Sequence, residues 1–359
     1  MLTRRFAAGL LALGALLLQT ACAGPSYYVQ AASGHFELMR ARQPVDAYLA
    51  AANPDDPIAA RLVTAREALD HAEHVMGLPV GDGYGTVAIT GRDAVTWNVV
   101  TTPAFDLRPR RWCFLVAGCV PYRGYFDPAD AERFAERMQA RGQDSAVSRA
   151  SAYSTLGWFD DPIVDTMLDG SEADLADVLF HELAHRALYV KNDSTFNESY
   201  ATFVARRGVE DWLAGRGQAA AYAAWAEREA AADVFLALLA DTRARLAALY
   251  REETDPAALA TGKRAAFDAL RERYRSLVET RWDGRDRFGG WFDPPPNNAD
   301  LALVATYTGG VCAFEALWRQ AGADWRRFHE LARARAEWSA ERRSRWLATP
   351  CPDGSRAAP

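Results

Sequence analysis

Two of the chain's six histidines lie four residues apart, with a glutamate directly after the first, in "FHELAHRALYV". The segment 171–190 is predicted to be a helix, because "SEAD" begins it with a capping pair and apolar residues then recur at helical spacing. Residues four apart lie on one side of a helix, so the imidazoles of His181 and His185 can bind one ion. Glu182 lies beside them, where its carboxylate can accept a proton from water held at that ion.

A catalytic zinc site needs a third protein ligand and one open position. Glu198 comes early in the next predicted helix, "FNESYATFVARRGVEDWL", and an antiparallel return would bring its carboxylate to the two histidines. The alternative for Glu198 is structural, since "TFNE" also fits a capping box whose glutamate binds only the first amide of its helix. The pattern predicts one Zn²⁺ on His181, His185 and Glu198, with Glu182 as the base of peptide-bond hydrolysis.

The elements around these residues predict an α+β fold, predominantly helical, with a small antiparallel sheet before the helix that carries the histidines. Apolar residues at helical spacing cover 27–76, and β-branched and aromatic residues punctuated by glycines predict strands over about 84–126. A helix over 128–141 and a strand in "DSAVSRASAYS" follow. Beyond Gly208 the pattern is helical, apart from "FGGWFDPPPNNAD", which has too many glycines and prolines for a helix.

We expect a signal segment at 1–21, a single zinc peptidase domain over 22–345 and a tail at 346–359. The parts expected within the domain are N-terminal helices (22–80), the sheet (81–160), the zinc-binding helix pair (161–214) and a helical C-terminal part (215–345). A chain of about 340 residues is long enough to bury one large core. No segment after the signal segment is expected to cross a membrane.

The N-terminus predicts export from the cytoplasm. Two arginines precede an apolar stretch over 6–18, which has the length of a signal-peptide core but is short for a bilayer span. Small residues then lead to Cys22, in a setting that resembles the bacterial lipobox, whose cysteine is lipidated. Ala23 favours the outer membrane, facing the periplasm, because inner-membrane lipoproteins usually have aspartate there. The alternative is a soluble periplasmic protein, since Gln19 stands where a lipobox usually has leucine.

The five cysteines fit an oxidising compartment. Removing Cys22 leaves an even set, Cys113, Cys119, Cys312 and Cys351. The preferred pairing is Cys113 with Cys119, which would close "CFLVAGC", and Cys312 with Cys351, which would hold the C-terminal tail. Four buried thiols are the alternative.

The composition argues against a nucleic-acid partner. The chain has 41 Lys and Arg against 47 Asp and Glu, a formal net charge of −6, and the signal segment holds two of the arginines and no acid. No basic patch is interleaved with aromatic residues, as nucleic-acid binding usually requires. The expected partners are therefore peptide substrates, and a membrane reached through the N-terminal lipid.

Five segments together resemble a bacterial family of zinc aminopeptidases, predicted lipoproteins of Gram-negative bacteria. They are "SYYVQAASGHFELMRARQPV", "TWNVVTTPAFDLRPRRWCFLVAGCVPYRGYF", "AYSTLGWFDDP", "HELAHRALYVKNDSTFNESYATFVARRGV" and "NNADLALVATY". The resemblance covers about 27–333. It implies a gluzincin-type peptidase with His181 and His185 as ligands, Glu198 of "NES" as the third ligand and Glu182 as base.

The chain departs from the wider gluzincin pattern between its ligands. The segment from the second histidine to the ligand glutamate is shorter than usual, so the two helices must be joined tightly. Four residues past that glutamate, where an acidic residue often orients a ligand histidine, the chain has Thr202. Asp193 is a candidate for the orienting role.

Gluzincins generally also use a tyrosine or histidine to stabilise the oxyanion. Tyr307 of "ATYTGG" is the candidate, and a core tyrosine is the alternative. Asn297 and Asn298 could bind substrate backbone, but capping of the helix that follows them is the preferred explanation.

An aminopeptidase must also bind a free α-ammonium group. Asp160 and Asp161 are candidates by their order along the chain, but a turn before Pro162 is the preferred explanation of both. The exopeptidase activity therefore rests on the family resemblance. A zinc endopeptidase, or a lipid-anchored protein that binds peptides or supports envelope assembly without cutting, are the alternatives. Glu182 favours an enzyme, because a structural zinc site has no use for a base.

Overall fold

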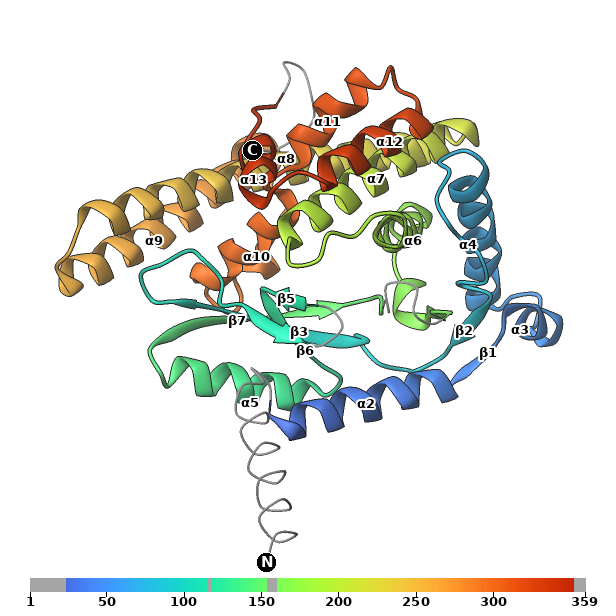
Figure 1. The fold of residues 1–359 in the computed structure, drawn as a ribbon, viewed down its shortest axis with the longest axis horizontal. Coiled ribbons are helices and arrows are strands. Elements are labelled where there is room, and N and C mark those ends of the chain that lie inside the picture. Colours follow the sequence, from blue (N-terminus) through green and yellow to red (C-terminus); the bar gives the residue numbers. More distant parts are fainter. Residues whose placement is uncertain (1–23, 115–117, 154–159, 352–359) are drawn as a thin grey trace, which may run out of the picture.

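The computed structural model describes residues 24–114, 118–153 and 160–351 (Figure 1). Helix accounts for 62% of the structure and strand for 11%. These proportions confirm the expected α+β class with a predominance of helix. The signal segment and Cys22 lie outside the described residues, so the expected lipidation stays a prediction.

The N-terminal part combines three helices with a three-stranded sheet. The helices are α2 (Pro25–Arg40), α3 (Val45–Ala51) and α4 (Pro57–His74), and the strands, in spatial order, are β1 (Arg42–Pro44), β2 (Thr86–Ala88) and β8 (Ile163–Val164). β1 and β2 are antiparallel, whereas β2 and β8 are parallel. The parallel pair differs from the expected antiparallel sheet. Because β8 has only two residues, no period could be read from its sequence.

A second sheet lies between two helices. β3 (Thr96–Pro103) is its central strand, antiparallel to β6 (Tyr122–Tyr125) on one side and to β7 (Gln143–Ala150) on the other. Side chains alternate across a strand. Accordingly Val99 packs with Phe134 of α5 (Pro128–Gln139), and Val100 packs with Ala299 of α10 (Asn298–Thr308).

The helices that carry the histidines and Glu198 follow the sheets. α6 spans Glu172–Ala187 and α7 spans Ser194–Gly215. Ser171 caps α6 in a capping box with Asp174, as the sequence predicts. α6 ends three residues before the expected position 190, because Leu188 is already extended.

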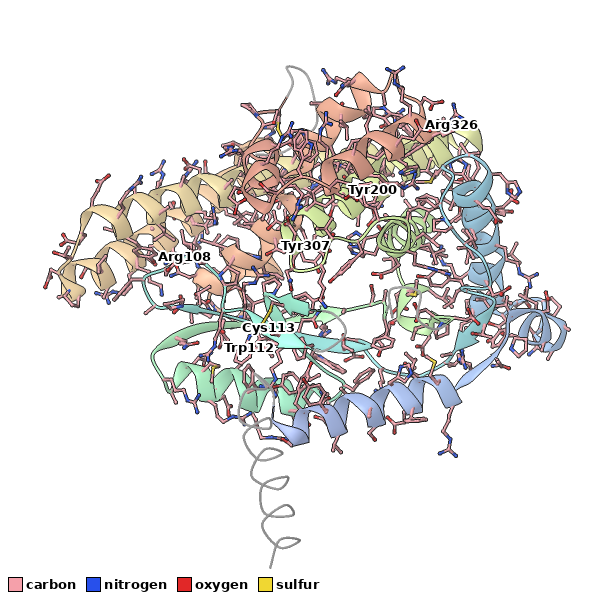
Figure 2. The ribbon with its side chains drawn as sticks, in the orientation of Figure 1. Arg108, Trp112, Cys113, Tyr200, Tyr307 and Arg326 are labelled. Atoms are coloured by element: carbon pink, nitrogen blue, oxygen red, sulfur yellow. A yellow bond between two sulfur atoms is a disulfide. The ribbon has the colours of Figure 1, made fainter. Side chains whose placement is uncertain are left out.

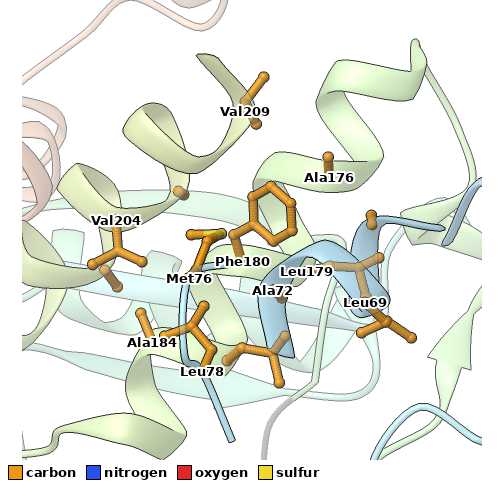
Figure 3. Close-up of a cluster of buried hydrophobic side chains, with 14 of the residues drawn as sticks. Leu69, Ala72, Met76, Leu78, Ala176, Leu179, Phe180, Ala184, Val204 and Val209 are labelled. Atoms are coloured by element: carbon orange, nitrogen blue, oxygen red, sulfur yellow. The ribbon is translucent and has the colours of Figure 1, made fainter. Parts of the chain in front are cut away.

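Close packing against α6 requires a glycine in α7. A Cβ at Gly208 would lie 2.3 Å from Cε of Met76 and 2.8 Å from a ring carbon of Phe180. These two side chains fill the space between α4, α6 and α7, together with Val204 and Val209 (Figure 3). The residue without a side chain thus lets the helices that carry the two histidines and Glu198 meet in one core.

The C-terminal part is helical, as expected. Its first two helices, α8 (Ala219–Glu252) and α9 (Pro256–Arg281), form a long hairpin (Figure 1). The remaining helices are α10, α11 (Val311–Gln320), α12 (Trp325–Ala336) and α13 (Ala340–Leu347). Within the described ranges there are also two short 3-10 turns, at Asp165–Met167 and Gly289–Phe292.

Two disulfides hold loops and ends in place. Cys113 of β4 (Trp112–Phe114) is bonded to Cys119 of β5 (Gly118–Val120), directly across a two-stranded ribbon. Cys312 of α11 is bonded to Cys351, which follows α13. Both bonds are those preferred from the sequence.

The segment Asn298–Gln320 is long and apolar enough to cross a membrane, with a mean hydropathy of 1.4. The sequence analysis overlooked that this segment passes a test of length and composition, but it did not expect any segment after the signal segment to cross a membrane, and that expectation stays a prediction. In the fold this segment forms α10 and α11, which are separate helices, and 56% of its apolar window is buried inside the protein. Burial in a core accounts for the same composition.

His329 of α12 is a buried histidine with both ring nitrogens bonded. It is 3% exposed. Its Nε2–H donates to the carbonyl of Met76 at 2.9 Å, and the Tyr200 hydroxyl donates to its Nδ1 at 2.8 Å. Burial, reinforced by the charge of Arg333, lowers the pKa of His329 to about 4. The neutral ring therefore links α12 to α7 and to the chain after α4.

We predict that His329 makes stability depend on pH. Below the ordinary pKa of 6.5 the unfolded chain binds a proton that the folded chain does not accept until about pH 4. This contribution is complete above pH 6.5 and falls by about 3 kcal/mol as the pH drops to 4. The free energy of unfolding of His329→Gln, measured with urea across this range, should lose that much pH dependence, with the exposed His74→Gln as matched control. If the free energy of unfolding changed equally with pH in the wild type, His329→Gln and His74→Gln, the prediction would be contradicted.

Candidate metal centre and active-site cavity

α6 presents two histidines from consecutive turns. The ring centroids of His181 and His185 are 4.8 Å apart, with the rings at 84° to each other. The opposite side of the helix is fixed in the core, since Leu179 and Leu183 are fully buried. His185 is 8% exposed and His181 is half-buried. The hydrophobic anchoring of α6 therefore sets the direction of both imidazoles.

A short reversal returns the chain to these imidazoles. The side-chain amide of Asn197 accepts from Val190 N at 2.7 Å and donates to Val190 O at 2.9 Å, which closes the link between α6 and α7. Asp193 caps α7 by accepting from Phe196 N. Glu198 thus stands in the second turn of α7 and is 8% exposed. This is the tight joint that the short sequence separation requires.

Three donor atoms meet at this joint. Nε2 of His181 lies 3.2 Å from Oε2 of Glu198 and 3.1 Å from Nε2 of His185, and the third side of the triangle, His185 Nε2 to Glu198 Oε2, is 3.4 Å. Tetrahedral zinc bonds of 2.0–2.2 Å place neighbouring ligand atoms about 3.4 Å apart. The triangle therefore has nearly the size of one face of a zinc tetrahedron, and the three residues fit a zinc ion.

The charges of the cluster support the same fit. For Glu198, burial raises the pKa, but the two imidazoles hold it well below its usual value. For His181, burial lowers the pKa, but the Glu198 carboxylate and the charges of Glu182 and Asp177 raise it to about 9. The cluster thus stabilises positive charge between the carboxylate and the rings, which is the charge that a divalent cation supplies.

Two cavities meet at this cluster. One, of about 610 Å³, is lined by all three ligand candidates and by aromatic rings of α2 and the second sheet. The other, of about 580 Å³, extends towards α8. The residues that line both are Asn98, Ala150, Ala152, His181, Glu182 and Tyr307. Glu182 is therefore open to ligands on either side, as a base must be.

Tyr307 reaches the cluster from α10 (Figure 2). Its ring is stacked on that of His181, with centroids 6.1 Å apart and an interplanar angle of 30°. Asn297 caps α10, as expected, and donates to the carbonyl of Ser145 in β7. Asn298 donates to the carbonyl of Ala104, just after β3. These bonds tie α10 to the sheet and so fix where Tyr307 points.

Two further tyrosines beside the cluster escaped the sequence analysis. Tyr122 of β6 and Tyr189 of the α6–α7 link both line the larger cavity. Burial, followed by the charge of Glu198, raises the pKa of Tyr122, Tyr189 and Tyr307. Tyr189 lies between the ligand candidates in sequence, so connectivity could have indicated it. Tyr122 carries no such signal, because strand pairing alone brings it to the site.

The acidic residues of the cavities are not those proposed for the α-ammonium. Asp161 is 1% exposed, its carbonyl accepts from Tyr84 N, and among the described lining residues neither it nor Asp160 appears. Asp177 and Glu229 line the smaller cavity instead. Asp177 precedes His181 by one helical turn, a spacing that could have indicated it. Glu229 comes from α8 and had no sequence signal.

Asp193 does not orient a ligand histidine. One of its carboxylate oxygens accepts from Phe196 N, and the other accepts from Arg343 Nε of α13 at 2.7 Å. Thr202, the other residue considered, lines the smaller cavity. Nδ1 of His185 has no hydrogen-bond partner in the part of the chain that the structure describes. Both carboxylate oxygens of Asp193, one candidate for orienting a histidine, therefore bind other groups.

Comparison with known proteins agrees with this arrangement. Neither the curated proteins nor the solved structures contain a match to the chain. A family model described as "Putative aminopeptidase" matches residues 26–347. The match extends from the first turn of α2 to the end of α13, and it includes every element that contributes to the cluster and the cavities. On this basis the chain belongs to that aminopeptidase family.

Proposed function

We propose that the protein is a zinc-dependent aminopeptidase whose ligands are His181, His185 and Glu198. The observation that carries the proposal is the approach of their three donor atoms to 3.1–3.4 Å from one another beside two cavities. When bound, zinc supplies Lewis-acid activation of a water molecule and of a substrate carbonyl. The family membership of the chain supports peptides as the substrates.

Glu182 is the proposed general base. Its carboxylate lines both cavities and follows His181 directly, outside the triangle of donor atoms. It would accept a proton from the attacking water and pass that proton to the departing amine. A carboxylate with no place among the ligands, yet open to the cavity, favours catalysis over a structural metal site.

Tyr307 is the proposed oxyanion donor. Its hydroxyl group belongs to a ring stacked on His181 and lines both cavities, so it can approach a carbonyl bound beside the cluster. A hydroxyl already positioned to donate a hydrogen bond to the developing oxyanion lowers the activation barrier, because it need not reorient during the reaction. Tyr122 lies across the larger cavity on β6 and is the second candidate.

Asp177 is the proposed partner of the substrate's α-ammonium. It lines the smaller cavity together with Glu182 and Glu229. Glu229 is paired with Arg206 of α7, which also pairs with Asp233. Asp177 precedes His181 by one helical turn and is therefore the better placed of the two to bind a cationic group beside the cluster.

An endopeptidase is the second candidate function. The two cavities share His181, Glu182 and Tyr307, so a peptide could occupy space on both sides of the scissile bond. A free amino terminus would then be unnecessary.

Glu182→Gln should retain zinc and lose hydrolysis. The substitution keeps the shape of the side chain but removes the proton acceptor, so kcat should fall by about 10²–10⁴-fold. His181→Ala removes a ligand and should lose both zinc and activity. Zinc content by elemental analysis and hydrolysis of amino-acid amides, with and without a chelator, measure the two effects. Full activity in zinc-loaded Glu182→Gln would eliminate Glu182 as the base.

Tyr307→Phe should lower kcat with little change in KM. Loss of one oxyanion donor costs about 10²–10³-fold in kcat. Tyr122→Phe should have a smaller effect, because its ring is not stacked on a ligand candidate. Tyr28→Phe, at the exposed edge of the same cavity, is the matched control. A larger loss of kcat in Tyr122→Phe than in Tyr307→Phe would identify Tyr122, rather than Tyr307, as the oxyanion donor.

Recognition of the free amine can be tested at Asp177. The wild type should cleave amides with a free amino terminus and leave N-blocked amides intact. In Asp177→Asn, inhibition by an amino-acid hydroxamate should weaken by about tenfold or more, because one charge-assisted hydrogen bond is lost. Inhibition by the analogue without the amino group should not change.

The other outcomes of this test are distinct. Cleavage of blocked and free substrates alike by the wild type would establish the endopeptidase. Equal weakening of both inhibitors in Asp177→Asn would show that Asp177 positions His181 rather than the amine. Absence of cleavage of any substrate by zinc-loaded protein would favour a peptide-binding role.

A further inference from the structure

One side of α2 exposes apolar side chains to solvent. Val29 is 68% exposed and Phe36 is 67% exposed. They are seven positions apart, so they lie on the same side of the helix, two turns apart, and the exposed Ala32 and Ser33 lie between them. Exposed apolar side chains arranged as a stripe on one helix indicate a surface that contacts a membrane or another protein.

The other side of α2 forms a wall of the candidate active site. Tyr27 and Ala31 line the cavity of about 610 Å³, and Tyr28 lies at its edge with 36% exposure. Leu38, nearer the end of the helix, is buried in the main core. α2 therefore separates the cavity from whatever covers its outer stripe.

The cysteine expected to carry a lipid, Cys22, comes directly before this helix in the sequence. Only Ala23 and Gly24 separate Cys22 from Pro25, the first residue of α2. A fully extended chain spans at most about 3.6 Å per residue, so the Cα of Cys22 lies within about 11 Å of that of Pro25. An acyl chain on Cys22 would hold the first turn of α2 that close to the bilayer surface.

The charges of α2 suit a lipid surface. Its one carboxylate, Glu37, is paired with Arg92 at 2.7 Å, and Arg40 ends the helix with an exposed guanidinium. An apolar helix side with little uncompensated negative charge can enter the boundary between headgroups and acyl chains. A lipid chain and an apolar helix side acting together anchor a protein more firmly than either alone.

We propose that the outer stripe of α2, formed by Val29, Ala32 and Phe36, lies on the lipid bilayer beside a lipidated Cys22. The wall of the cavity that contains Glu182 then lies next to the membrane surface. This orientation goes beyond the proposed function, because it places the proposed active site within the thickness of one helix from the bilayer.

Depth-dependent quenching tests the orientation without measuring activity. The full-length chain, lipidated in a bacterial envelope and purified, is reconstituted into phosphatidylethanolamine and phosphatidylglycerol vesicles. A fluorophore is attached at Phe36→Cys or, as control, at Arg326→Cys of α12. Arg326 is on the opposite side of the molecule from α2 (Figure 2), and its side chain is 89% exposed. The four native cysteines within the fold are bonded in pairs and do not react with the label.

Lipids brominated in their acyl chains should reduce the fluorescence at position 36 by about twofold or more and leave position 326 unchanged. Equal quenching at the two positions, or none at position 36, would overturn the proposal. Disulfide-linked dimers of unlabelled Phe36→Cys, without quenching at position 36, would overturn it in favour of a second copy of the chain. The Cys22→Ser variant should be recovered in the soluble fraction, because it lacks the cysteine that carries the lipid anchor. The same variant remaining in the membrane would contradict the role of Cys22.

Discussion

The reversal between α6 and α7 is the constraint on which the candidate metal centre depends. Residues 188–193 must turn the chain within a few residues. Asn197 binds both backbone groups of Val190 through one side-chain amide, and the carbonyl of Val190 also accepts from Asp193 N. Because Glu198 is the next residue, the same contact sets the position of its carboxylate opposite the imidazoles. Local hydrogen bonding in the link thus decides whether three donor atoms can share one ion.

The cavities depend on long-range contacts, which attach segments distant in sequence to the second sheet. Asn297 and Asn298 fasten the start of α10 to β7 and to the chain after β3, and Tyr307 is thereby brought over His181. Rings of α2 and β6 complete the opposite wall. The candidate base and the candidate ligands come from two adjoining helices, whereas the other residues that line the cavities come from distant parts of the chain. This division agrees with a general metal-binding motif placed inside a specific enclosure.

Short-range features of the site could be predicted from the sequence, and long-range ones could not. The spacing of His181 and His185, the capping of α6 and the return of Glu198 depend on helical periodicity, which is visible in a single sequence. Tyr122 and Glu229 reach the cavities through strand pairing and the packing of α8, which no local pattern encodes. Asp193 was one candidate for orienting a histidine, and its partner in the fold, Arg343, is 150 residues away, where no local pattern indicates it. The parallel strand β8 escaped detection because two residues carry no period.

The ion pair between Asp193 and Arg343 has a consequence for the order of assembly. Asp193 caps the helix that carries Glu198, and Arg343 is itself held by the carbonyl of Ala336 at 3.0 Å. A nascent chain that includes Glu198 but not yet α13 therefore lacks the ion pair that supports the start of α7. The final arrangement of the candidate metal centre consequently depends on a helix that is among the last parts of the chain to be synthesised.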